Sequence, residues 1–255
     1  MELLPTGFGT WEAAGLVVLS YFTSAITAAF GLGGGVMMLA AMASIMPSIA
    51  IIPVHGAVQM GSNGGRAWML RQHLDWSIFK YFVAGSVVGA AVASQVVVVL
   101  PREMLRLILG LFVLWAVWAP KLAKKDIGNS GFILVGTVTT FASMFVGATG
   151  LLIGAFMSPG KLGRMTTVST HAVCAMLQHG LKLIVFGLLG FAFQDWVPLV
   201  IAMIGTGFLG TFTGKKLLER LPEKVFGYVF KGLLTLLAAR LIILATIGLL
   251  DHGRE

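Results

Sequence analysis

Long apolar stretches follow one another along the whole chain, separated by short polar segments. Most of them reach the roughly 20 residues that a helix needs to cross the hydrocarbon core of a membrane. A first set comprises Trp11–Met46, Ile49–Leu70, Trp76–Leu100 and Leu105–Ala119. A second set comprises Gly131–Met157, Met165–Phe193, Trp196–Leu218 and Val225–Leu250. The pattern therefore predicts an all-α polytopic membrane protein.

The first stretch of each set is long and is interrupted by glycines. The interruptions are Gly31, Gly33, Gly34 and Gly35 in the first set, and Gly147 and Gly150 in the second. We expect each of these stretches to enter the membrane and return, as a re-entrant hairpin or as two short helices. Each half of the chain would then be a glycine-broken hairpin plus three transmembrane helices.

The two sets resemble two copies of one unit. At an offset of 116 residues the matching pairs are Gly31 and Gly147, His55 and His171, Met60 and Met176, Gly64 and Gly180, and Arg66 and Lys182. Further along, Asp75-Trp76 and Leu100-Pro101 correspond to Asp195-Trp196 and Leu221-Pro222. Internal duplication is common in secondary transporters. We therefore expect a first repeat over residues 1–126 and a second over residues 127–255, joined in one integrated domain.

The positions of the basic residues predict how the two halves are oriented. With hairpins at the glycine-broken stretches, one membrane face carries segments 66–80, 121–126, 161–164 and 215–224. These segments hold twelve of the eighteen lysines and arginines, and cytoplasmic loops are enriched in such residues. If each broken stretch were a single crossing, segments 161–164 and 215–224 would lie outside. The hairpins give each half an odd number of full crossings, so we expect two inverted repeats.

Composition agrees with a membrane protein and excludes several other classes. Only 11% of the residues are charged, whereas soluble domains carry about 25%, and the mean hydropathy is +0.93. Cytoplasmic loops account for the net charge of +8, so we expect no nucleic-acid partner. The single cysteine, Cys174, excludes an intrachain disulfide and a cysteine-based zinc site. We expect neither a metal site nor a cofactor.

Polar residues form a stripe on one predicted helix of each half. The first stripe holds His55, Gln59, Ser62, Asn63 and Arg66, whose spacing places them on one helix face. The second holds Thr167, His171, Cys174, Gln178 and Lys182, with Ser169, Thr170 and His179 nearby. Polar side chains inside a membrane are costly and tend to mark a pathway. Their alternative role is hydrogen bonding between helices, which is routine in membrane bundles.

The chemistry of the two stripes favours an anion. Arg66 and Lys182 are cationic, and neither stripe contains Asp or Glu. Cation sites usually carry carboxylates, whereas arginine binds an oxyanion such as sulfonate, sulfite or carboxylate with two hydrogen bonds. As alternatives, Arg66 could anchor the cytoplasmic end of its helix, and Lys182 could extend outward to the membrane surface.

The glycine breaks add further candidate binding residues. A break inside the membrane frees backbone N–H groups that need partners. A short helix that begins there directs its positive end inward, which favours an anion. We therefore include Gly33, Gly34 and Gly150, with hydroxyls of Thr23, Ser24, Thr27, Ser143 and Thr149 as additional donors. The alternative is a tight turn that needs no ligand.

These segments together resemble the TauE/SafE family of sulfite exporters, also called the TSUP family. The resemblance covers nearly the whole chain and rests on AAFGLGGGVMML, PVHGAVQMGSNGGRAW, GATGLLIG and THAVCAMLQHGLKL. It implies a bacterial or archaeal inner-membrane transporter with about eight spans built from a duplicated unit. It also implies sulfite, sulfoacetate or related organosulfonates as substrates, and export linked to the proton gradient. The matching motifs are those around Gly33–Gly35, His55–Arg66, Gly147–Gly150 and His171–Lys182.

We therefore expect a secondary transporter, not an enzyme, that binds a small anion between its halves and works by alternating access. The expected substrate-binding residues are His55, Gln59, Asn63, Arg66, His171, Gln178, Lys182, Gly33, Gly34 and Gly150. His55 and His171 would couple proton binding to anion binding, because histidine changes its charge near neutral pH. The expected partners are this anion and the lipid bilayer, and a homodimer is allowed for.

Three other interpretations stay open from the sequence. One is a transporter for another ligand, such as a carboxylate or a transition-metal cation, which metal-dependent binding would reveal. Another is a passive anion channel, which transport saturation would distinguish from a carrier. The third is a membrane enzyme or an assembly subunit, although no nucleophile, base and acid lie together at one predicted depth.

Overall fold

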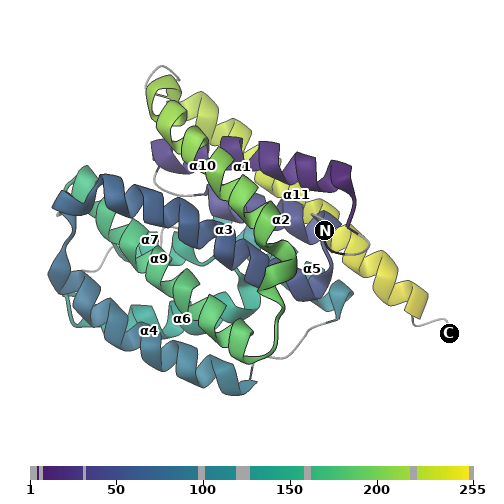
Figure 1. The fold of residues 1–255 in the computed structure, drawn as a ribbon, viewed down its shortest axis with the longest axis horizontal. Helices are drawn as coiled ribbons and strands as arrows, with labels where there is room; N and C mark the ends of the chain where they lie inside the picture. Colours follow the sequence, from purple (N-terminus) through teal and green to yellow (C-terminus); the bar gives the residue numbers. More distant parts are fainter. Residues whose placement is uncertain are drawn as a thin grey trace.

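The computed structural model describes residues 5, 8–30, 33–96, 101–118, 127–157, 162–218 and 223–252. In this part of the chain the structure consists of helices without strands, which confirms the predicted all-α class. By length and composition, the segments Trp76–Val96, Met165–Leu188 and Phe193–Thr213 are each able to cross a membrane. The chain is thus a helical membrane protein whose helices form one bundle (Figure 1).

Each half of the chain contributes the same order of helices. The first half forms α1 (Thr10–Phe30), α2 (Gly34–Ile45), α3 (Ser48–Met69), the 3-10 helix η1 (Arg71–His73), α4 (Trp76–Val96) and α5 (Arg102–Trp118). The second half forms α6 (Gly131–Val146), α7 (Gly150–Phe156), α9 (Arg164–Leu188), the 3-10 helix η2 (Phe193–Trp196), α10 (Val197–Leu218) and α11 (Glu223–His252). In both halves a broken pair precedes a long helix, a 3-10 turn and two further helices.

The first glycine break separates two helices that run in opposite directions. α1 runs parallel to α3, since Ser24 contacts Ser62 and, one turn later, the Thr27 carbonyl accepts a hydrogen bond from Arg66. α2 begins beside the middle of α3 and ends where α3 starts, so it runs antiparallel to both. The reversal depends on Gly33, whose φ of 103° lies in the left-handed region.

The second break lies at Gly147, between α6 and α7. Gly147 has a φ of 84°, and a Cβ atom there would meet the side chain of Leu39 in α2. Gly34, in the first break, leaves no room for a Cβ atom because it packs on the Thr23 carbonyl and the Thr27 hydroxyl. Both predicted glycine-broken stretches are therefore pairs of helices, which was one of the two forms expected.

The two halves interlock through their outer helices. α1 lies along α10, and α4 lies along α6, both in parallel (Figure 1). In the first pair the Ser20 hydroxyl donates a hydrogen bond of 2.6 Å to the Met203 carbonyl. Gly210 in the first pair and Gly85 in the second leave no room for a side chain, so the backbones approach closely. The first helix of each half thus packs on the other half.

The centre of the bundle is an antiparallel pair, α3 and α9. Gly56 of α3 lies against Lys182 of α9, and further along α3 Gly64 lies against Met176. The contacts between α5 and α11 also run in opposite order along the two helices. Helices that occupy the same place in each half therefore pack antiparallel to each other.

Apolar side chains cover the outside of the bundle. Leu134, Leu188 and Leu236 are 69%, 83% and 71% exposed, as expected for side chains that contact lipid. The largest apolar cluster lies around α2 and α3, with Met38, Leu39, Met42, Ile51 and Leu109 among its fully buried members. Polar side chains are buried at the centre, and apolar side chains face outward. This distribution is expected of a protein in a lipid bilayer.

The prediction of membrane faces from charge depends partly on residues 121–126, 161 and 219–222, which lie outside the described residues. α3 and α10 run in the same direction, because Gly61 and Gly65 of α3 lie against Ile204 and Phe208 of α10. The segments that follow these two helices therefore start from the same end of the bundle.

Candidate substrate-binding site

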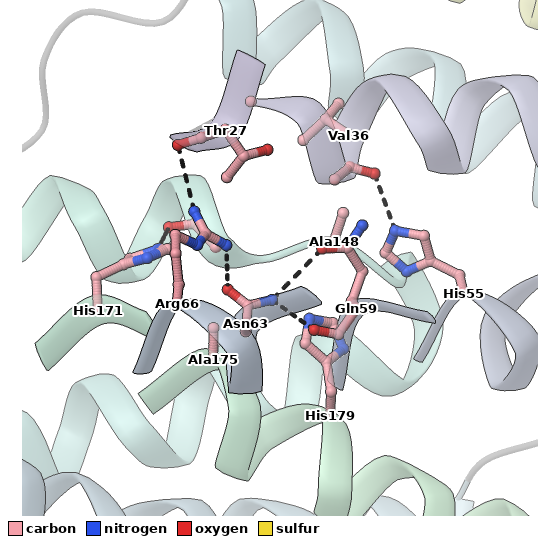
Figure 2. Close-up of a pocket in the computed structure, with 13 residues that line it drawn as sticks. Thr27, Val36, His55, Gln59, Asn63, Arg66, Ala148, His171, Ala175 and His179 are labelled. Atoms are coloured by element: carbon pink, nitrogen blue, oxygen red, sulfur yellow. Dashed lines mark hydrogen bonds between the residues drawn. The ribbon is translucent and has the colours of Figure 1, made fainter. Parts of the chain in front are cut away.

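A cavity lies at the centre of the bundle, where the two glycine breaks meet α3 and α9 (Figure 2). Its volume is about 40 Å³. It is lined by Thr27, Gly33, Gly35, Val36, His55, Gln59, Asn63, Arg66, Ala148, Gly150, His171, Ala175 and His179. Both halves of the chain contribute to this lining.

One face of α3 supplies the polar wall of the cavity. The Arg66 guanidinium donates 2.6 Å from Nη2 to the Asn63 side-chain oxygen and 3.3 Å from Nη1 to the Thr27 carbonyl. The Asn63 side-chain nitrogen in turn donates 2.8 Å to the Gln59 carbonyl. This chain of bonds, visible in Figure 2, holds the guanidinium against the cavity.

Two histidines occupy equivalent places in the two halves. His55 Nε2 lies 2.9 Å from the Gly35 carbonyl, and His171 Nε2 lies 2.9 Å from the Gly150 carbonyl. A carbonyl oxygen only accepts hydrogen bonds, so each Nε2 carries the proton. The Nδ1 atoms of both rings are buried and have no partner. Each histidine thus ties α3 or α9 to the first turn of the neighbouring short helix.

The cavity is surrounded by positive charge. Among the described residues, the buried charged side chains are Arg66 and Lys182, and no buried residue is Asp or Glu. The guanidinium lies next to His171 from the other half (Figure 2). Its Nε atom is buried and without a partner. The arrangement offers hydrogen-bond donors and positive charge without a carboxylate to neutralise them.

Three residues expected in the binding site lie beside the cavity without lining it. Lys182 is fully buried and donates 2.7 Å from Nζ to the Gly147 carbonyl at the second break, so it does not extend outward. Gln178 accepts a bond of 2.6 Å from Thr149 and donates to two threonines of α6. Gly34 packs on α1. The other seven expected residues line the cavity together.

Several lining residues were not in the expected set. Thr27 was considered only as an additional donor, and His179 only as a neighbour of the second stripe. An offset of 116 residues relates His179 to Asn63, and this signal was available in the sequence. Ala148 and Ala175 carry no chemical signal, because small apolar residues abound in membrane helices.

The described residues contain no group of three His, Cys, Asp or Glu side chains placed to hold a metal ion. The three cavity histidines belong to different segments, and two of them already bond to backbone carbonyls. The lining is therefore suited to a ligand that accepts hydrogen bonds.

The chain matches a known protein family. The family model described as sulfite exporter TauE/SafE matches residues 16–241 of the 255-residue chain. All residues that line the cavity lie within the matched range. Proteins of this family are membrane transporters and not enzymes. Neither curated proteins nor solved structures give a match to the chain.

Proposed function

The chain belongs to the TauE/SafE family of sulfite exporters, and we propose that it is a secondary transporter for a small sulfur-containing anion. The substrate is sulfite, sulfoacetate or a related organosulfonate, exported across the cytoplasmic membrane. One observation carries this proposal. Arg66 and three histidines, all buried side chains, line the central cavity, and the described residues contribute no carboxylate to it.

The electrostatics of Arg66 support an anionic substrate. A buried cation without a counter-charge is strongly unfavourable. An oxyanion in the cavity removes this penalty and accepts charge-assisted hydrogen bonds from the guanidinium that lines it. A cation in the same place would add repulsion, so charge alone selects against metal ions.

The size of the cavity supports a small oxyanion. Its volume of about 40 Å³ is enough for roughly three water molecules. A compact ion with three oxygens fits this space with little rearrangement.

The two equivalent histidines support proton coupling. While neutral, His55 and His171 each carry their proton on the Nε2 atom that bonds to a carbonyl. Their Nδ1 atoms then present lone pairs, which repel an anion. Protonation turns each Nδ1 into a donor, so proton uptake and anion binding favour each other.

The packing of the halves supports alternating access by inverted repeats. Equivalent helices, α3 with α9 and α5 with α11, pack antiparallel, which is the relation expected when one half is inverted. On α3, Lys182 lies level with Gly56, ten residues before Arg66, or roughly 15 Å along the helix. The two cations therefore lie toward opposite ends of the central pair and would attract the anion from each side.

The test is solid-supported-membrane electrophysiology on proteoliposomes that contain the purified protein. The panel is sulfite, sulfoacetate, taurine, sulfate and acetate. We expect saturable currents with sulfite or sulfoacetate, lost in Arg66→Gln and reduced in His171→Ala and Lys182→Ala. Arg240→Gln is the matched control, because Arg240 is exposed on α11 and does not line the cavity.

Three results would reject the proposal. If the folded protein gives no current with any of the sulfur anions, the proposed substrate class is wrong. Current that rises linearly with concentration would indicate a channel. Currents with acetate or sulfate alone would assign the site to another small anion.

A further inference from the structure

We propose that His179 is the neutral hydrogen-bond donor of the anion site and sets its preference for oxyanions. This inference rests on the proposed function. It goes beyond it because it gives a role in binding the anion to one residue of the second half, without an equivalent in the first. His179 comes from α9, lines the cavity, and is 4% exposed. Its ring contacts the His55 ring edge-on, with centroids 5.8 Å apart and planes at 74°.

His179 differs from the other two cavity histidines in its hydrogen bonding. His55 and His171 each use Nε2 to bond a backbone carbonyl. In the described part of the chain His179 has no such bond, and its Nδ1 atom is buried without a partner. Its tautomer is therefore not fixed by the protein. A neutral His179 can therefore carry its proton on Nε2, the ring nitrogen that is not buried.

This freedom gives the three rings different roles. A neutral His55 or His171 offers an anion only a lone pair at its second nitrogen. A neutral His179 offers an N–H donor without taking up a proton. The site can thus bind an anion through Arg66 and His179 before either of the other histidines is protonated.

The corresponding residue of the first half is not free to donate a hydrogen bond to the ligand. An offset of 116 residues relates His179 to Asn63. Asn63 uses its oxygen to accept from Arg66 and its nitrogen to donate to the Gln59 carbonyl. Asn63 therefore orients the arginine of its own half, while His179 remains available to the ligand. The anion site is asymmetric although the two halves correspond.

The surroundings of His179 favour an acceptor. Lys182, His55 and His171 act on the ring electrostatically, and Arg66 lines the same cavity. Each of these groups carries a positive charge or can acquire one. An unpaired N–H in such a place is stabilised by an oxygen that bears negative charge.

The first test compares His179→Phe with His179→Asn and His179→Gln. Phenylalanine keeps a ring against His55 but removes both nitrogens, whereas the amides restore a donor at the Nδ1 or the Nε2 position. We expect the half-saturating sulfite concentration to rise about tenfold or more in His179→Phe. At least one amide variant should stay within roughly threefold of the original. His73→Phe is the control, because His73 is exposed in η1.

A purely structural role would give another pattern. Equal half-saturation and equal selectivity in His179→Phe and the original protein would overturn the proposal, and so would failure of both amides to rescue a folded protein. If the original protein carries no anion, the proposed function fails as well. If it carries sulfite and His179→Phe is unaffected, this inference alone fails.

The second test follows the histidine resonances of the original protein, and it uses a variant only to assign the His179 signal. The chain has five histidines, so its imidazole nitrogen resonances after selective 15N labelling are few. Sulfite titration should shift the His179 signal, which is identified by its loss in His179→Gln. A His179 resonance that stays in place at saturating sulfite would contradict direct contact.

Discussion

Arg66 is held from two sides before any ligand arrives. Asn63 accepts from one terminal nitrogen and the Thr27 carbonyl accepts from the other. The side chain has little freedom left, so binding an anion costs little ordering of the guanidinium. The Nε atom is unpartnered, and the planar group still presents donors toward the cavity.

The geometry of Arg66 predicts that its shape matters as well as its charge. Lysine keeps the positive charge but cannot bond Asn63, Thr27 and an oxyanion together. We expect Arg66→Lys to raise the half-saturating sulfite concentration roughly tenfold while transport remains detectable. Arg240→Lys, on the exposed surface, should leave the saturation curve unchanged. Equal curves for Arg66→Lys and the original protein would exclude a direct guanidinium contact.

The proposed role of His171 in proton coupling predicts how transport depends on pH. Gln at this position can keep a donor on the Gly150 carbonyl but cannot take up a proton. For methanesulfonate, whose charge is constant near neutral pH, we expect binding by the original protein to tighten as pH falls. In His171→Gln this dependence should weaken, because one coupled proton is lost. An unchanged pH profile of the current would remove His171 from coupling.

Sequence reasoning identified much of the cavity lining because polar residues inside apolar helices are rare and therefore informative. The stripe on α3 gave His55, Gln59, Asn63 and Arg66, all of which line the cavity. It could not separate a cavity residue from one that bonds a neighbouring helix. Gln178 differs from Gln59 only in what surrounds it, namely the threonines of α6.

At the scale of the helix, the two glycine breaks position the binding residues. Each break ends one helix and begins another beside the middle of α3 or α9, where a histidine bonds its first turn. The Lys182 amine bonds the Gly147 carbonyl and so fills an acceptor that the break leaves open. The breaks and the central helices therefore form one hydrogen-bonded unit.

A small substitution in the second break is expected to lower the stability of the protein. In Gly147→Ala, the methyl group meets Leu39 and the φ of 84° becomes strained. We expect a loss of about 1–2 kcal/mol in the free energy of unfolding, measured by thermal denaturation in detergent. Gly15→Ala is the matched control, because nothing lies within 4 Å of its Cβ position on α1. A destabilised Gly15→Ala with a neutral Gly147→Ala would contradict this role of the break.

The sequence predicts the helices and their breaks, but it does not predict which helices pack against each other. Length and glycine spacing indicate where a span lies and where it is interrupted. The pairing of α1 with α10 depends on small residues such as Ser20 and Gly210 in close contact. Small residues occur on many faces of these helices, so the sequence alone does not select the pair.

At the scale of the whole molecule, two interlocked halves enclose one cavity. α1 packs on the second half and α6 on the first, so these helices tie the two halves together. The cavity lies where the central antiparallel pair meets both breaks (Figure 2). This is the place where rocking of one half against the other would change access.

The proposed inverted arrangement predicts which loops share a membrane face. Cys174 is the only cysteine and is buried, so single introduced cysteines can be labelled with little background. We expect cysteines at positions 71 and 216 to react with a membrane-impermeant thiol reagent from the cytoplasmic side, and one at 194 from the outside. Labelling of position 216 from outside the cell would reject the inverted repeat.

The central claim is that a small sulfur oxyanion occupies the cavity between the two halves. Selenite has the shape and charge of sulfite, and its selenium can be located by anomalous diffraction. We predict an anomalous peak inside the cavity, about 4 Å from the guanidinium nitrogens of Arg66, that disappears in crystals of Arg66→Gln. Crystals that bind selenite elsewhere, or that show no peak in the cavity at saturating selenite, would contradict the assignment.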